Sequence, residues 1–160
     1  MARIRPFRSR DAGAIVALSL RAWEPVFASL ERVLGSEVFL RQHPDWREDQ
    51  RRVVEEVLAE KGDRVWVAEA DGGVVGFVAI ELHHPERDMG ETSILAVDPD
   101  HQGSGVGSAL TDYALERLRE AGMRVATVET GGDPGHAPAR RTYEKAGYVK
   151  LPVTRYFKNL

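Results

Sequence analysis

The residues best suited to chemistry are the alternating glycines of the segment from Gln102 to Gly107, which reads QGSGVG. A predicted strand precedes this segment and a predicted helix follows it directly, so several backbone N–H groups can converge on an anion at the helix N-terminus. Glycine is needed where a side chain would keep the backbone away from a ligand, or where the backbone takes a positive φ. The segment therefore predicts a binding site for a diphosphate.

The glycine-rich loop has three other interpretations. A Walker loop needs Lys followed by Ser or Thr after its last glycine, whereas Ser108 and Ala109 follow here, which excludes it. A dinucleotide-binding fingerprint needs its third glycine one residue later and a tighter turn after the strand. Glu129 lies about where such a fold places its ribose-binding acid, so this alternative stays open. An ordinary glycine-rich loop without a ligand is the third alternative.

A second segment, from His136 to Tyr148, reads HAPARRTYEKAGY. Together the two segments resemble the signatures of the GNAT superfamily of N-acyltransferases: a Gln or Arg followed by spaced glycines, then a short helix that carries Tyr and a Gly-aromatic end. The resemblance covers residues 64–148 well and the N-terminal helices only by topology. It implies a mixed α/β fold around a mostly antiparallel central sheet with splayed strands. It also implies acetyl-CoA as cofactor and acetyl transfer to a primary amine by direct attack.

The resemblance assigns expected roles to the cofactor-binding residues. Main-chain groups of Leu95 and Val97 would hold the pantetheine arm in a V-shaped cleft. The pyrophosphate would lie against Gln102, Gly103, Ser104, Gly105, Val106, Gly107 and Ser108. His136 stands where many relatives have an Asn that helps to hold the cofactor. A neutral imidazole could donate the same hydrogen bond or relay a proton, and the alternative is that His136 caps the following helix or packs locally.

Two residues are the expected catalytic groups. Tyr143 would protonate the departing thiolate, because a phenol stays protonated near neutral pH; the alternative is that its ring only packs. Glu91 is the first candidate for the base that deprotonates the ammonium, and Glu81 and Glu129 are rivals. Strict alternation puts Glu91 on the same face as Leu95, but a bulge in this strand, common in the family, would change the parity.

The acceptor amine is not specified by any motif. Trp23, Phe27 and Trp46, with Glu24 and Asp45 nearby, could form an aromatic and acidic pocket for an amine, although aromatic residues at helical spacing more often belong to a core. The acceptor could be a polyamine, an aminoglycoside, an amino acid or a protein N-terminus. A small-molecule or peptide amine is therefore the expected partner.

Hydrophobic periodicity and turn residues predict a strand, three helices, three strands, a helix, a strand, a helix and a last strand. The expected elements are residues 4–7, 10–23, 26–41, 46–61, 64–70, 74–82, 91–97, 107–121, 125–129, 138–146 and 155–158. Pro25 is expected to break the first helical stretch, and Gly35 is a possible weak point in the second. Asp71 and Gly72 predict a tight hairpin turn.

Composition limits the other function classes. The 22 Lys and Arg nearly balance the 25 Asp and Glu, so no overall field recruits nucleic acid or an anionic membrane. There is no cysteine, which excludes disulfides, thiolate metal sites and a cysteine nucleophile, and no metal is expected. No leader and no segment approaching a membrane span is expected, so the protein is predicted to be cytoplasmic.

Residues 1–160 are expected to form one domain. Self-association through the late strands, common in the family, predicts a homodimer to which residues 153–160 could add. The alternatives in other function classes are an acyl-CoA sensor without turnover and a nicotinamide-dependent oxidoreductase.

Overall fold

The computed structural model describes the backbone of all 160 residues and every side chain except those of His84 and Pro85. One five-stranded sheet organises the chain in the order β1-β2-β3-β4-β5. Its strands are β1 (Arg3–Pro6), β2 (Val65–Ala70), β3 (Gly73–His84), β4 (Met89–Val97) and β5 (Val125–Thr127). The first four strands pair antiparallel, and β5 pairs parallel to β4. The mixed α/β class with a mostly antiparallel sheet is confirmed.

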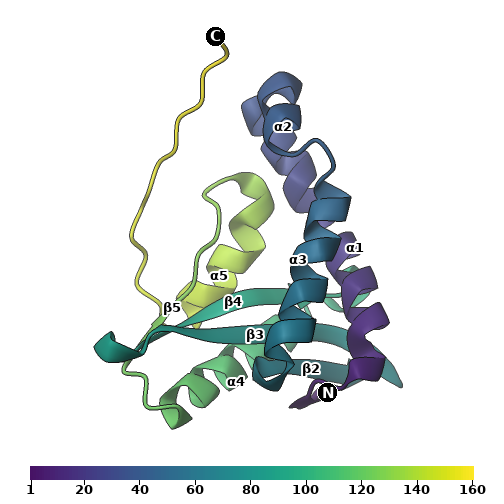
Figure 1. Cartoon of the computed structure of the whole chain (residues 1–160), viewed down its shortest axis with the longest axis vertical. Helices are drawn as coiled ribbons and strands as arrows, with labels where there is room; N and C mark the ends of the chain where they lie inside the picture. Colours follow the sequence, from purple (N-terminus) through teal and green to yellow (C-terminus); the bar gives the residue numbers. More distant parts are fainter.

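Helices cover both faces of the sheet (Figure 1). The α-helices are α1 (Ala12–Leu34), α2 (Ser36–Gln42), α3 (Trp46–Lys61), α4 (Val106–Glu120) and α5 (Ala137–Lys145). Short 3-10 turns lie at Ser9–Asp11, Gly62–Arg64, Pro85–Arg87, Pro99–His101 and Pro134–His136. Helices α1 and α3 pack on one face, and α4 packs on the other.

The two faces bury separate hydrophobic clusters, because successive side chains of a strand point to opposite sides. Phe77 and Ala79 of β3 pack against Ile15 of α1 and the apolar stripe of α3. Val78 of the same strand packs against Leu110 and its neighbours on α4. The alternation along β3 therefore fixes which helices each strand residue meets.

Local turn chemistry explains several boundaries. Asp71 and Gly72 both have positive φ, as a tight hairpin between β2 and β3 requires, so the predicted hairpin is confirmed. The Asp45 carboxylate accepts from the Glu48 N–H and caps α3. Gly35, at φ 79°, separates α1 from α2.

The prediction that Pro25 breaks the first helix is wrong, because α1 runs through Pro25 without interruption. A proline inside a helix costs about 3 kcal/mol through a lost hydrogen bond and a clash. Contacts on both sides of Pro25 offset that cost: the N-terminal half packs in the core through Ile15 and Leu18, and the buried Ser29 is bonded to the loop before α5. The break occurs instead at Gly35, so residues 26–41 do not form one helix.

The predicted last strand at residues 155–158 is not formed. The C-terminal segment of residues 149–160 is exposed, has no regular secondary structure, and extends away from the body (Figure 1). Its large apolar side chains are mostly uncovered: Val149, Leu151, Val153, Tyr156, Phe157 and Leu160. β5 also ends at Thr127, earlier than predicted, so the sheet has an open edge on the side of β5.

One helical stretch, Ser9–Leu34, has the length and the mean hydropathy, 1.2, of a helix that could cross a membrane. The expectation that no segment approaches such a span is therefore wrong by length and composition. In the fold this helix contributes Ile15 and Leu18 to the core and pairs its Arg21 with Asp98 and Asp100.

A buried ion-pair network ties the first strand to α1. The Arg5 guanidinium donates to both Asp11 carboxylate oxygens, at 2.7 and 2.9 Å, and to Glu69 Oε1 at 2.5 Å. The hydrogen bonds from Arg5 lower the pKa of Asp11, and they outweigh the opposing effect of burial. Asp11 and Arg5 are 5% and 6% exposed, so each depends on the other for its solvation.

Asp11→Asn is expected to lower the free energy of unfolding by about 3 kcal/mol, because Arg5 loses a buried carboxylate partner. Since the folded state lowers the Asp11 pKa, its contribution is present at neutral pH and is lost as the pH falls through the folded-state pKa. Urea unfolding of the wild type and the variant at neutral and acidic pH measures both effects. Asp49→Asn, which removes an exposed pair with Arg52, is the matched control and should change the value by less than about 0.5 kcal/mol.

Candidate active site

The parallel strands β4 and β5 separate after a short paired stretch. Only Met89, Gly90 and Glu91 have partners on β5, although β4 continues to Val97. Beyond Glu91 the edge of β4 that faces β5 has no strand partner. An extended ligand could pair with this free edge as another strand would.

A β-bulge at Ser93 sets the direction of the β4 side chains. Thr92 pairs with Ile80 and Ile94 pairs with Ala79, which leaves Ser93 without a cross-strand partner. The bulge puts Glu91 on the face that carries α1 and α3, whereas Leu95 and Val97 point into the core against α4. The strict alternation that placed Glu91 with Leu95 is therefore wrong, for the reason that the bulge supplies.

The glycine-rich loop connects the end of β4 to α4. Gly103 and Gly105 have φ values of 78° and 90°, and no atom lies within 4 Å of a Cβ built on either. The N–H groups of residues 106–108 form the first turn of α4, where no intrahelical acceptor exists. The loop therefore has the open glycines and free donors that an anion site needs.

Side chains of the same loop brace it from within. Gln102 Nε2 donates to the Val97 carbonyl at 3.1 Å, and Ser104 Oγ donates to the His101 carbonyl at 2.5 Å. On the neighbouring turn, Asp98 and Asp100 pair with Arg21 of α1, at 2.8 and 3.0 Å. The Gln102 side chain thus stabilises the loop. The hydrogen-bond donors of this segment that remain available for an anion are backbone N–H groups.

Two glycines of the sheet let α4 approach closely enough to aim its N-terminus at the end of β4. A Cβ on Gly76 would lie 3.0 Å from Leu110 Cδ1 and from the Ala96 carbonyl oxygen. A Cβ on Gly90 would lie 2.5 Å from Leu118 Cδ2. Larger residues at these positions would push the helix off the sheet.

Tyr143 lies in the last turn of α5, beside Tyr148, which neighbours Thr92 of β4. Its ring meets the Tyr148 ring edge-on at 5.8 Å. Burial, together with the neighbouring Tyr148, raises the pKa of Tyr143 to about 12. Burial also raises the pKa of Tyr148, and the adjacent Thr92 hydroxyl offsets part of that rise. Tyr143 is therefore a protonated phenol over the whole physiological pH range.

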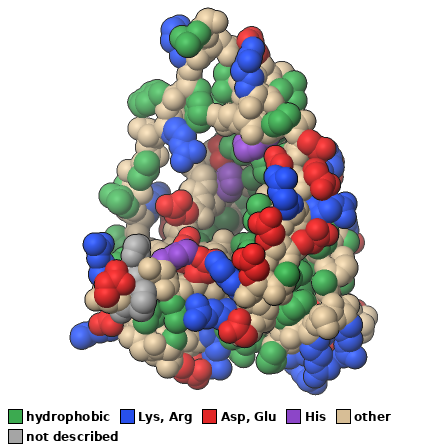
Figure 2. Space-filling view, in the orientation of Figure 1, with side chains coloured by type: hydrophobic (Ala, Val, Ile, Leu, Met, Phe, Trp, Pro, Cys, Tyr) green, Lys and Arg blue, Asp and Glu red, His purple; other side chains and the backbone are tan. Residues whose placement is uncertain are grey.

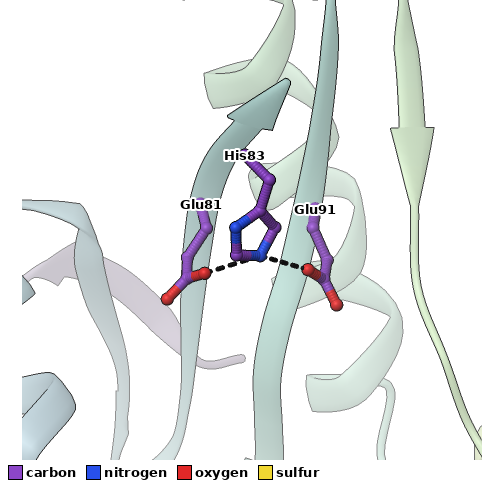
Figure 3. A group of neighbouring side chains, drawn as sticks. All are labelled: Glu81, His83 and Glu91. Carbon is purple, nitrogen blue, oxygen red and sulfur yellow. Dashed lines mark ion pairs between the residues drawn. The ribbon is translucent and has the colours of Figure 1, made fainter. Parts of the chain in front are cut away.

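The carboxylates considered as bases have different surroundings. Glu81 and Glu91 face each other across β3 and β4, and both contact the imidazole of His83 (Figure 3). Lys61 of α3 pairs with Glu81. Glu129 is exposed and lies beyond the end of β5. The structure therefore groups Glu81 and Glu91 and leaves Glu129 apart; sequence reasoning did not identify His83.

A second polar cluster holds His136 at the start of α5. The buried Ser29 hydroxyl donates to Asp133 Oδ2 at 2.6 Å, and His136 Nδ1 contacts Asp133 Oδ1. The Gly135 N–H donates to Ser29 Oγ at 2.9 Å. Burial raises the pKa of Asp133, but the hydrogen bonds from Ser29 and His136 outweigh it and the net pKa is lowered. The cluster links the middle of α1 to the loop between β5 and α5.

This cluster changes the expectation for His136. Because Asp133 accepts from Nδ1, the neutral imidazole carries its proton there and presents Nε2 as an acceptor. It therefore cannot donate from Nε2, as an Asn amide could, unless the ring is protonated. A Cβ on Gly131 would lie 2.4 Å from both His136 Nδ1 and Asp133 Oδ1, which explains the glycine-rich turn. Asp133 and Ser29 were not identified from the sequence, since they are far apart in it.

The aromatic residues expected to form an acceptor pocket do not assemble into one. Phe27 and Trp46 stack on each other with ring centroids 4.5 Å apart, and Trp23 packs against the core. Glu24 pairs with Arg47, and Asp45 caps α3. These contacts support the alternative that the residues hold α1 to α3.

The face that carries the site is hollowed. Figure 2 shows a depression between the sheet below, the helices on one side and the C-terminal segment on the other, with carboxylate and imidazole side chains around it. The same view in Figure 1 places α5 and β4 behind this depression.

Comparison with known proteins gives the family. The model of the acetyltransferase (GNAT) domain matches residues 61–150. A mycothiol acetyltransferase from Sanguibacter keddieii is 33% identical over 147 residues, covering 85% of this chain and 45% of the relative. One from Saccharomonospora viridis is 31% identical and covers 91% of this chain and 45% of the relative. The chain thus spans somewhat less than half the length of these relatives.

Solved structures share the fold at lower sequence identity. The PaiA N-acetyltransferase from Thermoplasma acidophilum, in complex with coenzyme A, has a TM-score of 0.71 and 15% identity, covering 97% of this chain and 93% of that one. The ribosomal-protein-S18-alanine N-acetyltransferase from Escherichia coli has a TM-score of 0.64 and 19% identity, covering 95% and 80%. With the family model spanning more than half of its residues, the chain belongs to the GNAT acetyltransferase family.

Proposed function

We propose that this chain is an acetyl-CoA-dependent N-acetyltransferase that acts on a primary amine by direct attack. The observation that carries the proposal is the glycine loop between the free edge of β4 and the N-terminus of α4. Its positive-φ glycines and unpaired N–H groups suit a pyrophosphate, and the strand edge suits an extended pantetheine arm. The coenzyme A complex of the structural neighbour supports this choice of ligand.

The cofactor would be held mainly by backbone groups. We assign the pantetheine arm to the main chain of Leu95 and Val97, and the pyrophosphate to residues 102–108, with Gln102 acting as a brace. His136 would contribute Nε2 as an acceptor. When bound, acetyl-CoA supplies the acetyl group and a thiolate leaving group.

Two side chains would move the protons. Glu91 would take the proton from the acceptor ammonium, which leaves the nitrogen lone pair free to attack. Tyr143 would donate to the departing sulfur, because its pKa of about 12 keeps the phenol protonated. Two observations support these roles: Glu91 is the last β4 residue that pairs with β5, and Tyr143 contacts Tyr148, which neighbours Thr92 of β4.

The acceptor is proposed to be a small-molecule or peptide amine. One relative is named for mycothiol and one structural neighbour for the alanine of a ribosomal protein, so both kinds of amine are candidates. The carboxylates Glu81 and Glu91 favour a cationic ammonium over an anionic acceptor. A panel of polyamines, aminoglycosides, amino acids and peptides identifies the acceptor.

Acetyl-CoA and free coenzyme A are each expected to raise the melting temperature as their concentration passes the dissociation constant, whereas NAD is not. The shift reflects binding to the native state alone, worth about 2.7 kcal/mol at 100 times the dissociation constant. A thermal-shift titration with the three ligands in parallel measures it. The proposal would be contradicted if neither acetyl-CoA nor coenzyme A raised the melting temperature. A rise with NAD alone would favour the oxidoreductase alternative.

We also propose that the chain forms a homodimer through its C-terminal segment. Val149, Leu151 and Val153 alternate along an extended backbone and are each more than 80% exposed. The open edge of β5 offers unpaired backbone groups to such a strand from a second copy. Pairing of this kind would cover the apolar side chains and complete the sheet.

The dimer predicts a solution mass twice that of one chain. Leu151→Glu with Val153→Glu should give a monomer without loss of thermal stability of the fold, because both side chains are exposed in the single chain. Light scattering on size-exclusion chromatography measures the mass, and Lys150→Glu with Thr154→Glu, on the opposite side of the strand, is the control. A wild type that is monomeric at all accessible concentrations would contradict the dimer.

The remaining proposals concern organisation. We propose that residues 1–160 act as one domain, since helices on both faces share one sheet. We also propose a cytoplasmic location, which suits a cysteine-free chain that uses acetyl-CoA.

A further inference from the structure

His83 of β3 stands between two carboxylates of the candidate site. Glu81 and Glu91 pair directly across β3 and β4, so their side chains lie close together. The His83 ring lies between them (Figure 3). Like charges directly opposite each other destabilise a sheet. The imidazole therefore separates two carboxylates that would otherwise repel each other.

One N–H group of the imidazole serves both carboxylates. His83 Nε2 lies 2.6 Å from Glu81 Oε2 and 2.5 Å from Glu91 Oε2. An ionised carboxylate only accepts hydrogen bonds, so Nε2 is the donor and its hydrogen is shared between the two acceptors. Lys61 of α3 pairs with the other oxygen of Glu81. Both oxygens of Glu81 are therefore bound, whereas Glu91 is bound through Oε2.

The second oxygen of Glu91 remains open to a ligand. Within the part of the chain that the structure describes, no hydrogen bond or ion pair involves Glu91 Oε1. The Glu91 side chain is 26% exposed, against 13% for Glu81. Of the two carboxylates, Glu91 is thus the one with an oxygen available for an acceptor ammonium.

The contacts do not suit a metal ion between the three side chains. Ligand atoms around a zinc ion, each about 2.0–2.2 Å from it, lie about 3 Å or more apart. The two contacts of His83 Nε2 are shorter than that, as a shared hydrogen allows. Lys61 also occupies the other oxygen of Glu81, where a cation would have to compete with it.

We propose that His83 is a positioning residue that holds Glu91 ready to act as the base. This rests on the proposed function of Glu91. The Nε2–H group fixes Oε2 and offsets the charge of Glu81, which leaves Oε1 to the acceptor. The ammonium N–H bond breaks, its electron pair stays on nitrogen, and the proton goes to Oε1. The carboxylic acid then loses that proton to water, and His83 keeps its own proton throughout.

His83→Ala is expected to lower kcat about tenfold, because the base loses a hydrogen bond to its charged group and is repelled by Glu81. The KM for acetyl-CoA should not change, since the cofactor is assigned to the edge of β4 and the glycine loop. His83→Phe, which keeps a ring but has no N–H, should be as slow as His83→Ala. His83→Gln should stay within about twofold of the wild type, because its amide also donates. Steady-state kinetics with each substrate varied measures kcat and both KM values.

A double-mutant cycle with Glu91→Gln tests whether His83 acts through Glu91. Glu91→Gln removes the base and should lower kcat about 100-fold or more. Adding His83→Ala should lower kcat by less than a further factor of about two, because no base remains to be positioned. Losses that multiply would overturn the proposal, and so would a His83→Gln variant as slow as His83→Ala.

His101→Ala is the matched control, because its imidazole also pairs with a carboxylate, that of Asp71 on the hairpin between β2 and β3. It should keep the wild-type kcat, and thermal melting of each variant confirms folding. If the wild type acetylates no amine, or if Glu91→Gln is fully active, the proposed function of Glu91 fails and the positioning role fails with it. An impaired Glu91→Gln beside fully active His83→Ala and His83→Phe would overturn the positioning role alone.

Discussion

Tyr143→Phe is expected to lower kcat about 100-fold or more and to leave the KM for acetyl-CoA nearly unchanged. The substitution removes only the hydroxyl, so the ring contact with Tyr148 is kept. The loss follows because the departing thiolate has no proton donor, and the pKa of about 12 makes Tyr143 a protonated phenol at any working pH. Steady-state kinetics with saturating amine measures both constants.

Tyr113→Phe is the matched control for this experiment. Tyr113 lies on α4, where it packs against Arg117 of the same helix and Trp66 of β2. This position is away from the splay of β4, so kcat should not change. Full activity of Tyr143→Phe would mean that its ring only packs α5 against its neighbours. If the wild type bound acetyl-CoA but acetylated no amine in the panel, the sensor alternative would be favoured.

Gly105→Val is expected to raise the dissociation constant of coenzyme A about 100-fold. Loss of two hydrogen bonds to a charged phosphate, each worth about 1.5 kcal/mol or more, corresponds to a change of at least that size. Gly105 lies at φ 90° directly before α4, and a β-branched side chain there disturbs the backbone and covers the N–H groups of the first turn. Isothermal titration with coenzyme A measures the change.

Gly122→Val separates backbone strain from loss of the site. Gly122 has a similar φ of 87° and equally open surroundings, but it lies at the other end of α4. Both variants should lose similar stability in urea, whereas only Gly105→Val should lose coenzyme A. Equal binding by the two variants would mean that the loop does not hold the pyrophosphate.

The elements that local chemistry determines could be predicted from the sequence. The Asp71 turn needs positive φ, and the glycines before α4 form a pattern that few structures other than an anion loop require. The order of strands and helices up to α5 followed from periodicity, because each element has one apolar face.

The elements that depend on distant contacts could not be predicted in this way. Pro25 stays helical because Ser29, four residues later, is bonded to Asp133 in a loop more than 100 residues away. The C-terminal segment has the alternation of a strand, but the single chain offers it no partner. In both cases the local sequence favours a structure that does not form, because tertiary contacts decide the outcome.

The candidate site was predictable where one continuous segment forms it, as in residues 102–108. The clusters around His83 and Asp133 combine residues from different elements, so no spacing in the sequence reveals them. The face of Glu91 could be determined only from the register of β3 and β4, because one bulged residue reverses the parity.

That bulge also divides β4 into two functional halves. On its N-terminal side the strand presents Glu91 on the face that carries α1 and α3, and on its C-terminal side it packs Leu95 and Val97 against α4, next to the glycine-rich loop. Deleting Ser93 would make Thr92 and Ile94 adjacent while they still face Ile80 and Ala79, so both halves would keep their present faces. The extra residue therefore supplies local twist and bend in β4, whereas the register with β3 determines the direction of the side chains on either side of it.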